Sequence, residues 1–125
     1  MAKIAVYCAG PYTLGDVGAN MNRHLDMYNV LLDCGYYPLM PCLNHFLHMY
    51  KPRDYEVWLD LDFVLLERAN CMIRLEGESP GSDREEAYAK ELGIPVYHSL
   101  GELRAKEPVK REPKYKNYGF VFGGN

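Results

Sequence analysis

Short apolar runs alternate along this chain with longer segments in which apolar residues recur every three or four positions. The runs are rich in β-branched and aromatic residues and are bounded by Gly or Pro, which is typical of buried strands. The longer segments have the spacing of amphipathic helices, and Gly35 stands where the first of them should end. The pattern predicts strands over residues 3–9, 36–41, 71–75 and 94–98, and helices over 19–34, 54–68, 83–92 and 100–106.

The regular alternation of strands and helices predicts an α/β fold with a mostly parallel central sheet of four to five strands and helices on both faces. Ligands bind such sheets in the crevice at the carboxyl ends of the strands. Three loops should meet there, over residues 10–18, 43–53 and 76–82. We therefore expect the active site at these loops.

The starts of two predicted helices carry capping signals. Asp54 can cap the helix that follows it, and Ser99 with Glu102 has the spacing of a capping box.

We expect a catalytic domain over residues 1–105 and a tail over 106–125. In the tail, aromatic residues alternate like a strand that docks on a neighbouring subunit. These residues are Tyr118, Phe120 and Phe122.

Composition narrows the class of protein. The 125 residues predict one domain, and a net charge of −3 argues against a dedicated nucleic-acid binder. No apolar stretch approaches the roughly 20 residues of a membrane span, and the chain enters its first strand without a leader pattern. Four cysteines fall one per segment, which favours reduced thiols in a cytoplasmic protein. They are Cys8, Cys34, Cys42 and Cys71.

The first and third loops are candidate anion sites. The glycine-rich loop 10–18 and the loop ending in Ser79, Gly81 and Ser82 both lead into a helix, where free amides and hydroxyls can hold a 5′-phosphate. A second interpretation remains open for each loop. The first loop matches neither the dinucleotide nor the P-loop fingerprint, and a glycine-rich connection needed only for its geometry also explains it. In the third loop, Ser82 and Glu85 have the spacing of a capping box, in which Glu85 only satisfies the Ser82 amide.

Acidic residues on the helix after the second loop are candidates for glycosidic chemistry. Cleavage of a glycosidic bond uses one carboxyl group at the anomeric carbon and one for the leaving group's proton. Asp60, Asp62 and Glu67 are available, although a solvated helix face is the better explanation for any single one of these aspartates.

The second loop contains a cluster of cysteine and histidine residues. The spacing of Cys42, His45 and His48 matches no common zinc pattern, so we expect neither a metal nor a cofactor. Asn44, His45 and Tyr50 are interpreted as residues that bind a base or pack the loop. No Gly-x-Ser-x-Gly elbow is present, which argues against a serine hydrolase.

Three motifs together resemble the nucleoside 2-deoxyribosyltransferase superfamily, and within it the 2′-deoxynucleoside 5′-phosphate N-hydrolases and nucleotide N-glycosidases. The first is Tyr7-x-x-Gly10, and the second is Asp62 eight residues before Asn70. The third and most specific is the run Ser79-x-Gly81-x-x-x-Glu85-x-x-x-Ala89-x-x-x-Gly93-x-Pro95. The resemblance covers residues 3–98 and implies a flavodoxin-like, or Rossmann-like, sandwich.

The resemblance also implies roles for individual residues. Glu85 corresponds to the nucleophile that forms a covalent glycosyl intermediate, Tyr7 to the residue that positions it, and Asp62 to the group that holds the sugar or acts on the leaving base. Ser79 and Gly81 correspond to contacts of the 5′-phosphate. Further residues expected to bind substrate are Gly10, Pro11, Tyr12, Asn44, His45, Ser82 and Arg84.

These inferences predict an enzyme that cleaves the base–sugar bond of a nucleoside or deoxynucleoside 5′-monophosphate through a glycosyl-Glu85 intermediate. The resemblance also implies a homodimer or a higher homo-oligomer. Two alternatives remain: a 2-deoxyribosyltransferase that exchanges bases, and a nucleotide-binding sensor without turnover.

Overall fold

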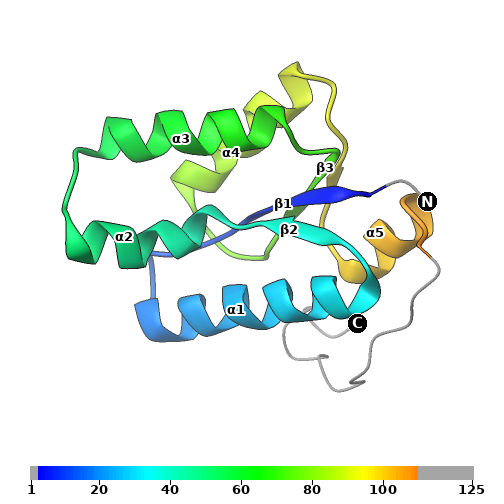
Figure 1. Ribbon diagram of the computed structural model, residues 1–125, viewed down its shortest axis with the longest axis horizontal. Helices are drawn as coiled ribbons and strands as arrows, with labels where there is room; N and C mark the ends of the chain where they lie inside the picture. Colours follow the sequence, from blue (N-terminus) through cyan, green and yellow to red (C-terminus); the bar gives the residue numbers. More distant parts are fainter. Residues whose placement is uncertain (1–2, 110–125) are drawn as a thin grey trace.

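A computed structural model describes residues 3–109 and shows a four-stranded, all-parallel sheet in the order β2-β1-β3-β4 (Figure 1). The strands are β1 (Ala5–Ala9), β2 (Tyr37–Leu39), β3 (Cys71–Arg74) and β4 (Val96–Tyr97). The helices are α1 (Val17–Cys34), α2 (Asn44–Tyr50), α3 (Tyr55–Glu67), α4 (Pro80–Glu91) and α5 (Leu100–Lys106), with a short 3-10 helix η1 (Pro41–Leu43). The predicted α/β fold and its parallel sheet are confirmed.

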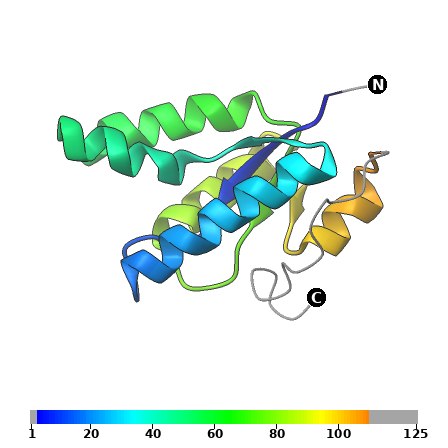
Figure 2. The ribbon, with the colours of Figure 1, turned by 60° about the horizontal axis from the view of Figure 1, so that its bottom comes forward.

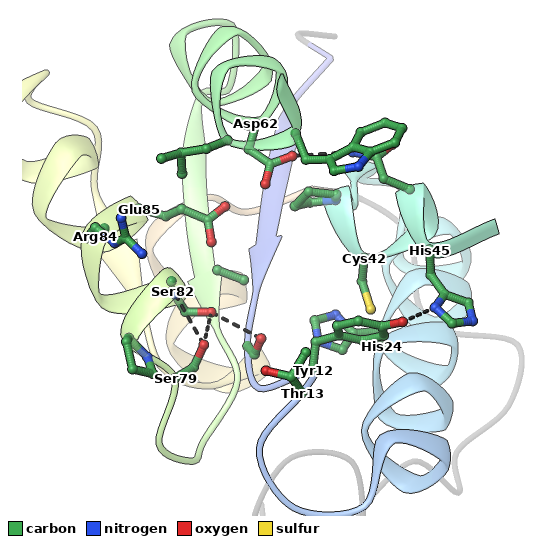
Figure 3. A pocket seen from close by; sticks show the side chains of 18 of the residues that line it. Tyr12, Thr13, His24, Cys42, His45, Asp62, Ser79, Ser82, Arg84 and Glu85 are labelled. Carbon is green, nitrogen blue, oxygen red and sulfur yellow. Dashed lines mark hydrogen bonds between the residues drawn. The ribbon is translucent and has the colours of Figure 1, made fainter. Parts of the chain in front are cut away.

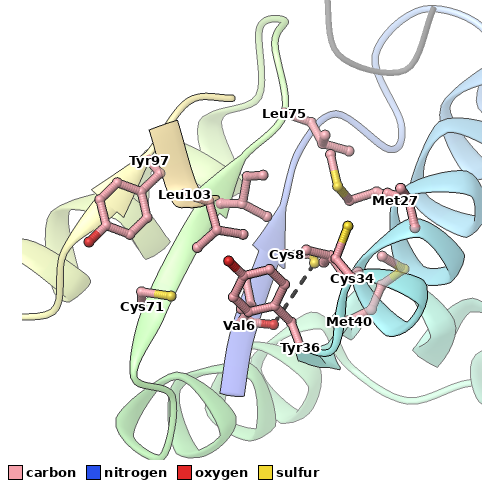
Figure 4. Close-up of a cluster of buried hydrophobic side chains, with 13 residues drawn as sticks. Val6, Cys8, Met27, Cys34, Tyr36, Met40, Cys71, Leu75, Tyr97 and Leu103 are labelled. Carbon is pink, nitrogen blue, oxygen red and sulfur yellow. Dashed lines mark hydrogen bonds between the residues drawn. The ribbon is translucent and has the colours of Figure 1, made fainter. Parts of the chain in front are cut away.

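The helices cover both faces of the sheet, with α1 and α5 on one face and α3 and α4 on the other (Figures 1 and 2). Successive side chains of a strand point to opposite faces. Val6 and Cys8 of β1 therefore pack toward α1, in the cluster drawn in Figure 4. Tyr7 and Ala9 lie on the opposite face, in a second buried cluster with Leu66 of α3 and Ala89 of α4. The side chain of Tyr7 is thereby directed toward α4.

The strand order places a topological switch point between β1 and β3. From β1 the chain first adds β2 on one side and later adds β3 on the other. The helices that these strands lead into, α1 after β1 and α4 after β3, consequently lie on opposite faces of the sheet, and a ligand crevice is expected at this edge. The crevice lies at the edge that the sequence predicts for the active site.

Helix α4 begins earlier than the sequence predicts. The Ser79 hydroxyl accepts the Ser82 amide at 3.2 Å, so Ser79 caps the helix and Pro80 is its first residue. The capping-box interpretation of Ser82 and Glu85 is therefore wrong, and the Glu85 carboxyl group is available for another role. Helix α1 also begins early, at Val17, because the Asp16 carboxylate accepts the Ala19 amide at 3.0 Å.

The second loop is more helical than predicted. Residues 41–50 form η1 and α2, with Pro41 at a first helical position, where its fixed φ is favourable. In α3, Leu66 is fully buried, whereas Leu61 is 39% exposed. Asp54 stands at the cap of α3 as predicted, without a side-chain cap bond.

The remaining predictions concern the cap of α5, the cysteines, membrane-spanning helices and the C-terminal tail. Ser99 caps α5 through the Glu102 amide, as predicted. All four cysteines are free thiols. None of the helices in residues 3–109 is both long and apolar enough to cross a membrane. Residues 110–125, and with them the predicted aromatic strand of the tail, lie outside the described part of the chain.

Candidate active site

A cavity of about 600 Å³ opens at the carboxyl ends of β1 and β3 (Figure 3). This volume is in the range of small-molecule sites. All three predicted loops contribute to its walls. The predicted site residues that line it are Gly10, Tyr12, Asn44, His45, Asp62, Ser79, Gly81, Ser82, Arg84 and Glu85.

Glu85 lies in the second turn of α4 and is 7% exposed. The Tyr7 hydroxyl, from the face of β1 that meets α4, donates a hydrogen bond to Glu85 Oε2. Burial raises the pKa of Glu85 to about 7, against the opposing effects of the Tyr7 hydrogen bond and the charges of Arg74 and Arg84. Burial, and then the charges of Glu85 and Asp62, raise the pKa of Tyr7, so its hydroxyl remains a donor.

Asp62 projects from α3 toward the same space, and Figure 3 shows both carboxyl groups pointing into the cavity. Asp62 Oδ1 accepts a hydrogen bond from the side-chain amide of Asn44 at 3.3 Å. Burial, followed by the charge of Glu85, raises the pKa of Asp62 to about 7, while the Asn44 amide lowers it. Two interacting carboxyl groups of this kind lose their protons in two steps and share one proton between them.

The distribution of that proton follows from the neighbours. The Tyr7 hydroxyl is a donor and stabilises a negative charge on Glu85. Near neutral pH, the singly protonated pair therefore has its charge on Glu85 and its proton on Asp62. The pair can then offer a charged carboxylate and a proton donor in one cavity.

The start of α4 is the candidate anion site, and its hydroxyls are already in use. The Ser79 hydroxyl donates to Ser82 Oγ at 2.9 Å, and the Ser82 hydroxyl donates to the Gly10 carbonyl at 3.0 Å. In this turn, Pro80 has no N–H, and the Gly81 amide makes no hydrogen bond within the described residues. An arriving anion is thus offered the Gly81 amide and the positive end of the helix dipole.

Arg84 adds a cation beside this turn. Its guanidinium donates to the Tyr55 hydroxyl at 2.9 Å and lies 5.4 Å from the centre of the Tyr55 ring. Tyr55 begins α3 and also lines the cavity, so this contact joins the starts of α3 and α4 at the cavity wall. No ion pair with a carboxylate in residues 3–109 neutralises Arg84.

The loops after β1 and β3 fit against each other through two glycines. A Cβ on Gly10 would lie 2.7 Å from Leu75 Cβ, and a Cβ on Gly77 would lie 2.6 Å from Pro11 Cγ. Gly77 also has a φ of 124°, a conformation that other residues rarely adopt. Pro11, expected to contact substrate, instead packs on Gly77 outside the cavity lining.

Arg74 holds the second of these loops. It is buried at the end of β3 and donates to the carbonyls of Leu75 and Gly77. It also pairs with Asp83 at 3.1 Å in the first turn of α4. No sequence motif marked Arg74, because two of its partners are carbonyl groups that any residue type carries.

Histidines and aromatic residues form the wall on the α2 side. Tyr12 and His45 are hydrogen-bonded through the hydroxyl and Nδ1, and Trp58 donates to His48 Nδ1 at 2.8 Å. Trp58 and His48 line the cavity but were not selected from the sequence. The available signal was helical spacing, because Trp58 stands four residues before Asp62 on the same face of α3.

The other candidates lie elsewhere. Tyr50 is 92% exposed and does not line the cavity. Asp60 is exposed, and Glu67 accepts the Tyr88 hydroxyl at 2.5 Å outside the cavity, as expected of a solvated helix face. Asn70 accepts the Ala5 amide at 2.7 Å and joins the start of β1 to β3. Within residues 3–109, no three His, Cys, Asp or Glu side chains converge as metal ligands.

Among solved structures, the chain is similar to a 2-deoxyribosyltransferase from the psychrotolerant bacterium Bacillus psychrosaccharolyticus, described as a biocatalyst for nucleoside synthesis. The TM-score is 0.61 at 20% sequence identity, over 74% of this chain and 69% of that chain. The chain has the fold of a 2-deoxyribosyltransferase. No model of a known protein family matches the sequence, and no curated protein matches it.

The 2-deoxyribosyltransferase fold confirms the resemblance drawn from the sequence motifs at the level of architecture. It agrees with the predicted flavodoxin-like sandwich, since both consist of a parallel sheet with helices on its two faces. The motif residues Tyr7, Asp62, Ser79 and Glu85 are far apart in the sequence but meet at one crevice of this fold.

Proposed function

We propose that this protein is a nucleotide N-glycosidase, a hydrolase that cleaves the base–sugar bond of a nucleoside or deoxynucleoside 5′-monophosphate. The observation that supports this most strongly is the pair of buried carboxyl groups in one cavity, Glu85 held by the Tyr7 hydroxyl and Asp62 beside it. Glycosidic cleavage with retention requires such a pair in two different protonation states.

In the first step, the Glu85 carboxylate forms a bond to C1′ of the sugar. The C1′–N bond breaks, its electron pair leaves with the base, and Asp62 transfers its proton to the base. Tyr7 keeps Glu85 charged and oriented during the attack. The products of this step are a free base and a glycosyl-Glu85 ester.

In the second step, a water molecule attacks C1′ while the Asp62 carboxylate takes one of its protons. The bond between C1′ and Glu85 breaks, and both carboxyl groups return to their starting states. A second base in place of water gives the alternative activity, transfer of 2-deoxyribose, by the same Glu85 intermediate. The fold shared with a 2-deoxyribosyltransferase is compatible with either activity.

The candidate anion site favours a 5′-monophosphate over a nucleoside. The unused Gly81 amide, the start of α4 and the guanidinium of Arg84 all suit a phosphate better than an uncharged hydroxyl. The hydroxyls of Ser79 and Ser82 can join when they exchange their present acceptors for phosphate oxygens.

We also propose that the enzyme is a homo-oligomer of the cytoplasm. Helix α3 is apolar around most of its circumference, which is typical of a helix covered on all sides. Only Leu66 of α3 is buried within the chain, and Val57, Leu61 and Val64 are exposed. A second copy that covers this face would bury them. Free thiols at all four cysteines suit a reducing compartment.

The test is chromatographic detection of free base after incubation with nucleosides and their 5′-monophosphates. Wild type is compared with Glu85→Gln and with Glu86→Gln, which alters the neighbouring glutamate outside the cavity lining. We expect base release from monophosphates by wild type and Glu86→Gln, and loss of at least about a thousandfold in Glu85→Gln.

The alternatives give different results. Base release that depends on an added second base would identify the transferase. Saturable nucleotide binding without any base release would leave the sensor, and equal turnover by wild type and Glu85→Gln would refute the assigned nucleophile.

A further inference from the structure

Two pairs of side chains connect α2 to α3 along the cavity. Asn44 of α2 donates to Asp62 of α3 at 3.3 Å. His48, four residues after Asn44, accepts from Trp58, four residues before Asp62, at 2.8 Å. Because residues four apart lie on one face of a helix, the second pair is stacked about one turn, or roughly 6 Å, beyond the first.

The hydrogen bonds of His48 determine which ring nitrogen carries its proton. The indole N–H of Trp58 and the backbone N–H of Arg53 are both directed at His48 Nδ1, at 2.8 and 3.3 Å. Each of these groups is only a donor, so Nδ1 must offer a lone pair. We assign the proton of His48, which lines the cavity, to Nε2, so that Nε2–H can donate a hydrogen bond.

This second pair lies where the proposed reaction requires the nucleobase. In the proposed function, on which this inference rests, C1′ lies between Glu85 and Asp62, and the base extends away from Glu85. Trp58 and His48 line the cavity about one turn beyond Asp62. An aromatic face and a fixed donor are the elements that bind and identify a base.

We propose that His48 determines base specificity by selecting bases that present an oxo group at this edge over those that present an amino group. An oxo group accepts the hydrogen bond of Nε2–H. His48 is exposed in this structure, and a bound base would cover its Nε2–H. An amino group at this edge would then place two donors against each other, which disfavours that substrate. The enzyme should therefore prefer uracil over cytosine nucleotides and hypoxanthine over adenine nucleotides.

Steady-state kinetics with these four 5′-monophosphates test the proposal. We expect wild type to show a preference of up to about tenfold in kcat/KM for each oxo base, the effect of one hydrogen bond made or lost. His48→Ala should lose the preference. His48→Gln should lose it while retaining more activity, because its amide can rotate to offer either a donor or an acceptor. His98→Ala, outside the cavity lining, is the matched control.

Nuclear magnetic resonance of the histidine nitrogens tests the same proposal without turnover. In the Glu85→Gln variant, we expect the His48 signals of the Nε2–H form, and a shift of Nε2 when uridine 5′-monophosphate is added. Trp58→Phe retains a ring but removes the donor to Nδ1, so a larger share of the Nδ1–H form should appear.

The outcomes separate this inference from the proposed function. Base release with the same base preference in wild type and His48→Ala would overturn the role of His48 and leave the glycosidase intact. Absence of base release, together with a His48 shift on nucleotide binding, would overturn the glycosidase and support His48 as a base-binding residue.

Discussion

Replacing Glu85 by glutamine should make the protein more stable at neutral and alkaline pH while removing its activity. Burial raises the pKa of this carboxyl group from 4.5 to about 7. An unfolded chain leaves the group near its ordinary value, so between these two pH values the folded protein binds more protons than the unfolded one. The free energy of unfolding then falls as the pH rises through this range.

The magnitude follows from the two values. Each pKa unit is equivalent to about 1.4 kcal/mol, so the difference between 4.5 and about 7 corresponds to about 3 kcal/mol once Glu85 is fully charged. Glutamine has nearly the same shape, and its Oε1 can accept the Tyr7 hydroxyl. Glu85→Gln should thus raise the free energy of unfolding by up to about 3 kcal/mol at pH 8. Near pH 4 it should have little effect.

Thermal unfolding followed by circular dichroism between pH 4 and pH 8 measures this difference. A gain of about 3 kcal/mol raises the Tm of a domain of this size by roughly 10 °C. An equal Tm difference at both ends of the pH range, or a loss of stability at pH 8, would refute the idea that the folded state penalises the Glu85 charge.

Glu86→Gln is the control, because its expected effect on stability at pH 8 has the opposite sign. Burial acts to raise the pKa of Glu86, but the hydrogen bond and charge of Lys90, with the charges of His98 and Arg74, lower it overall. This charge stabilises the folded state above the ordinary glutamate pKa, and the stabilisation is lost as the pH falls. Glu86→Gln should therefore reduce Tm at pH 8.

Three other changes test separate parts of the structure. Tyr7→Phe removes a hydrogen bond that lowers the pKa of Glu85, so the acidic limb of the kcat/KM profile should move to higher pH and kcat should fall; an unmoved limb would contradict the role of Tyr7. Leu61→Glu should shift sedimentation toward the monomer without loss of helical signal, and an unchanged sedimentation coefficient would place any interface elsewhere. Gly77→Ala should cost about 1–3 kcal/mol of stability, because of its φ of 124° and its contact with Pro11, and Pro11→Ala should restore part of this in a double-mutant cycle.

The sequence predicted the order of strands and helices well, because buried strands and amphipathic helices leave clear periodicities. It was less informative where a side chain has two possible partners. Ser82 and Glu85 have the spacing of a capping box, but Ser79 takes the cap, and Glu85 turns to Tyr7, 78 positions away. A contact of this sequence separation leaves no local periodicity to detect.

The cavity wall on the α2 side was predicted incompletely for a related reason. Residues 43–53 lack a clean apolar stripe, so the helix that brings His48 opposite Trp58 was not expected. The sequence shows the glycines of the two site loops, but it does not show which contacts require them. Gly10 and Gly77 are required by side chains that the other loop supplies.

These reciprocal contacts have a practical consequence for anyone who redesigns the site. Leu75 packs against Gly10 and Pro11 packs against Gly77, so the conformation of each loop depends on a side chain of the other loop. A library that varies one loop alone will mostly recover misfolded or unchanged proteins. Variation is better directed to positions such as Tyr12 and Thr13, which face the cavity from the same loop and leave the paired glycines intact. The two loops should be inherited, exchanged or transplanted only as a pair.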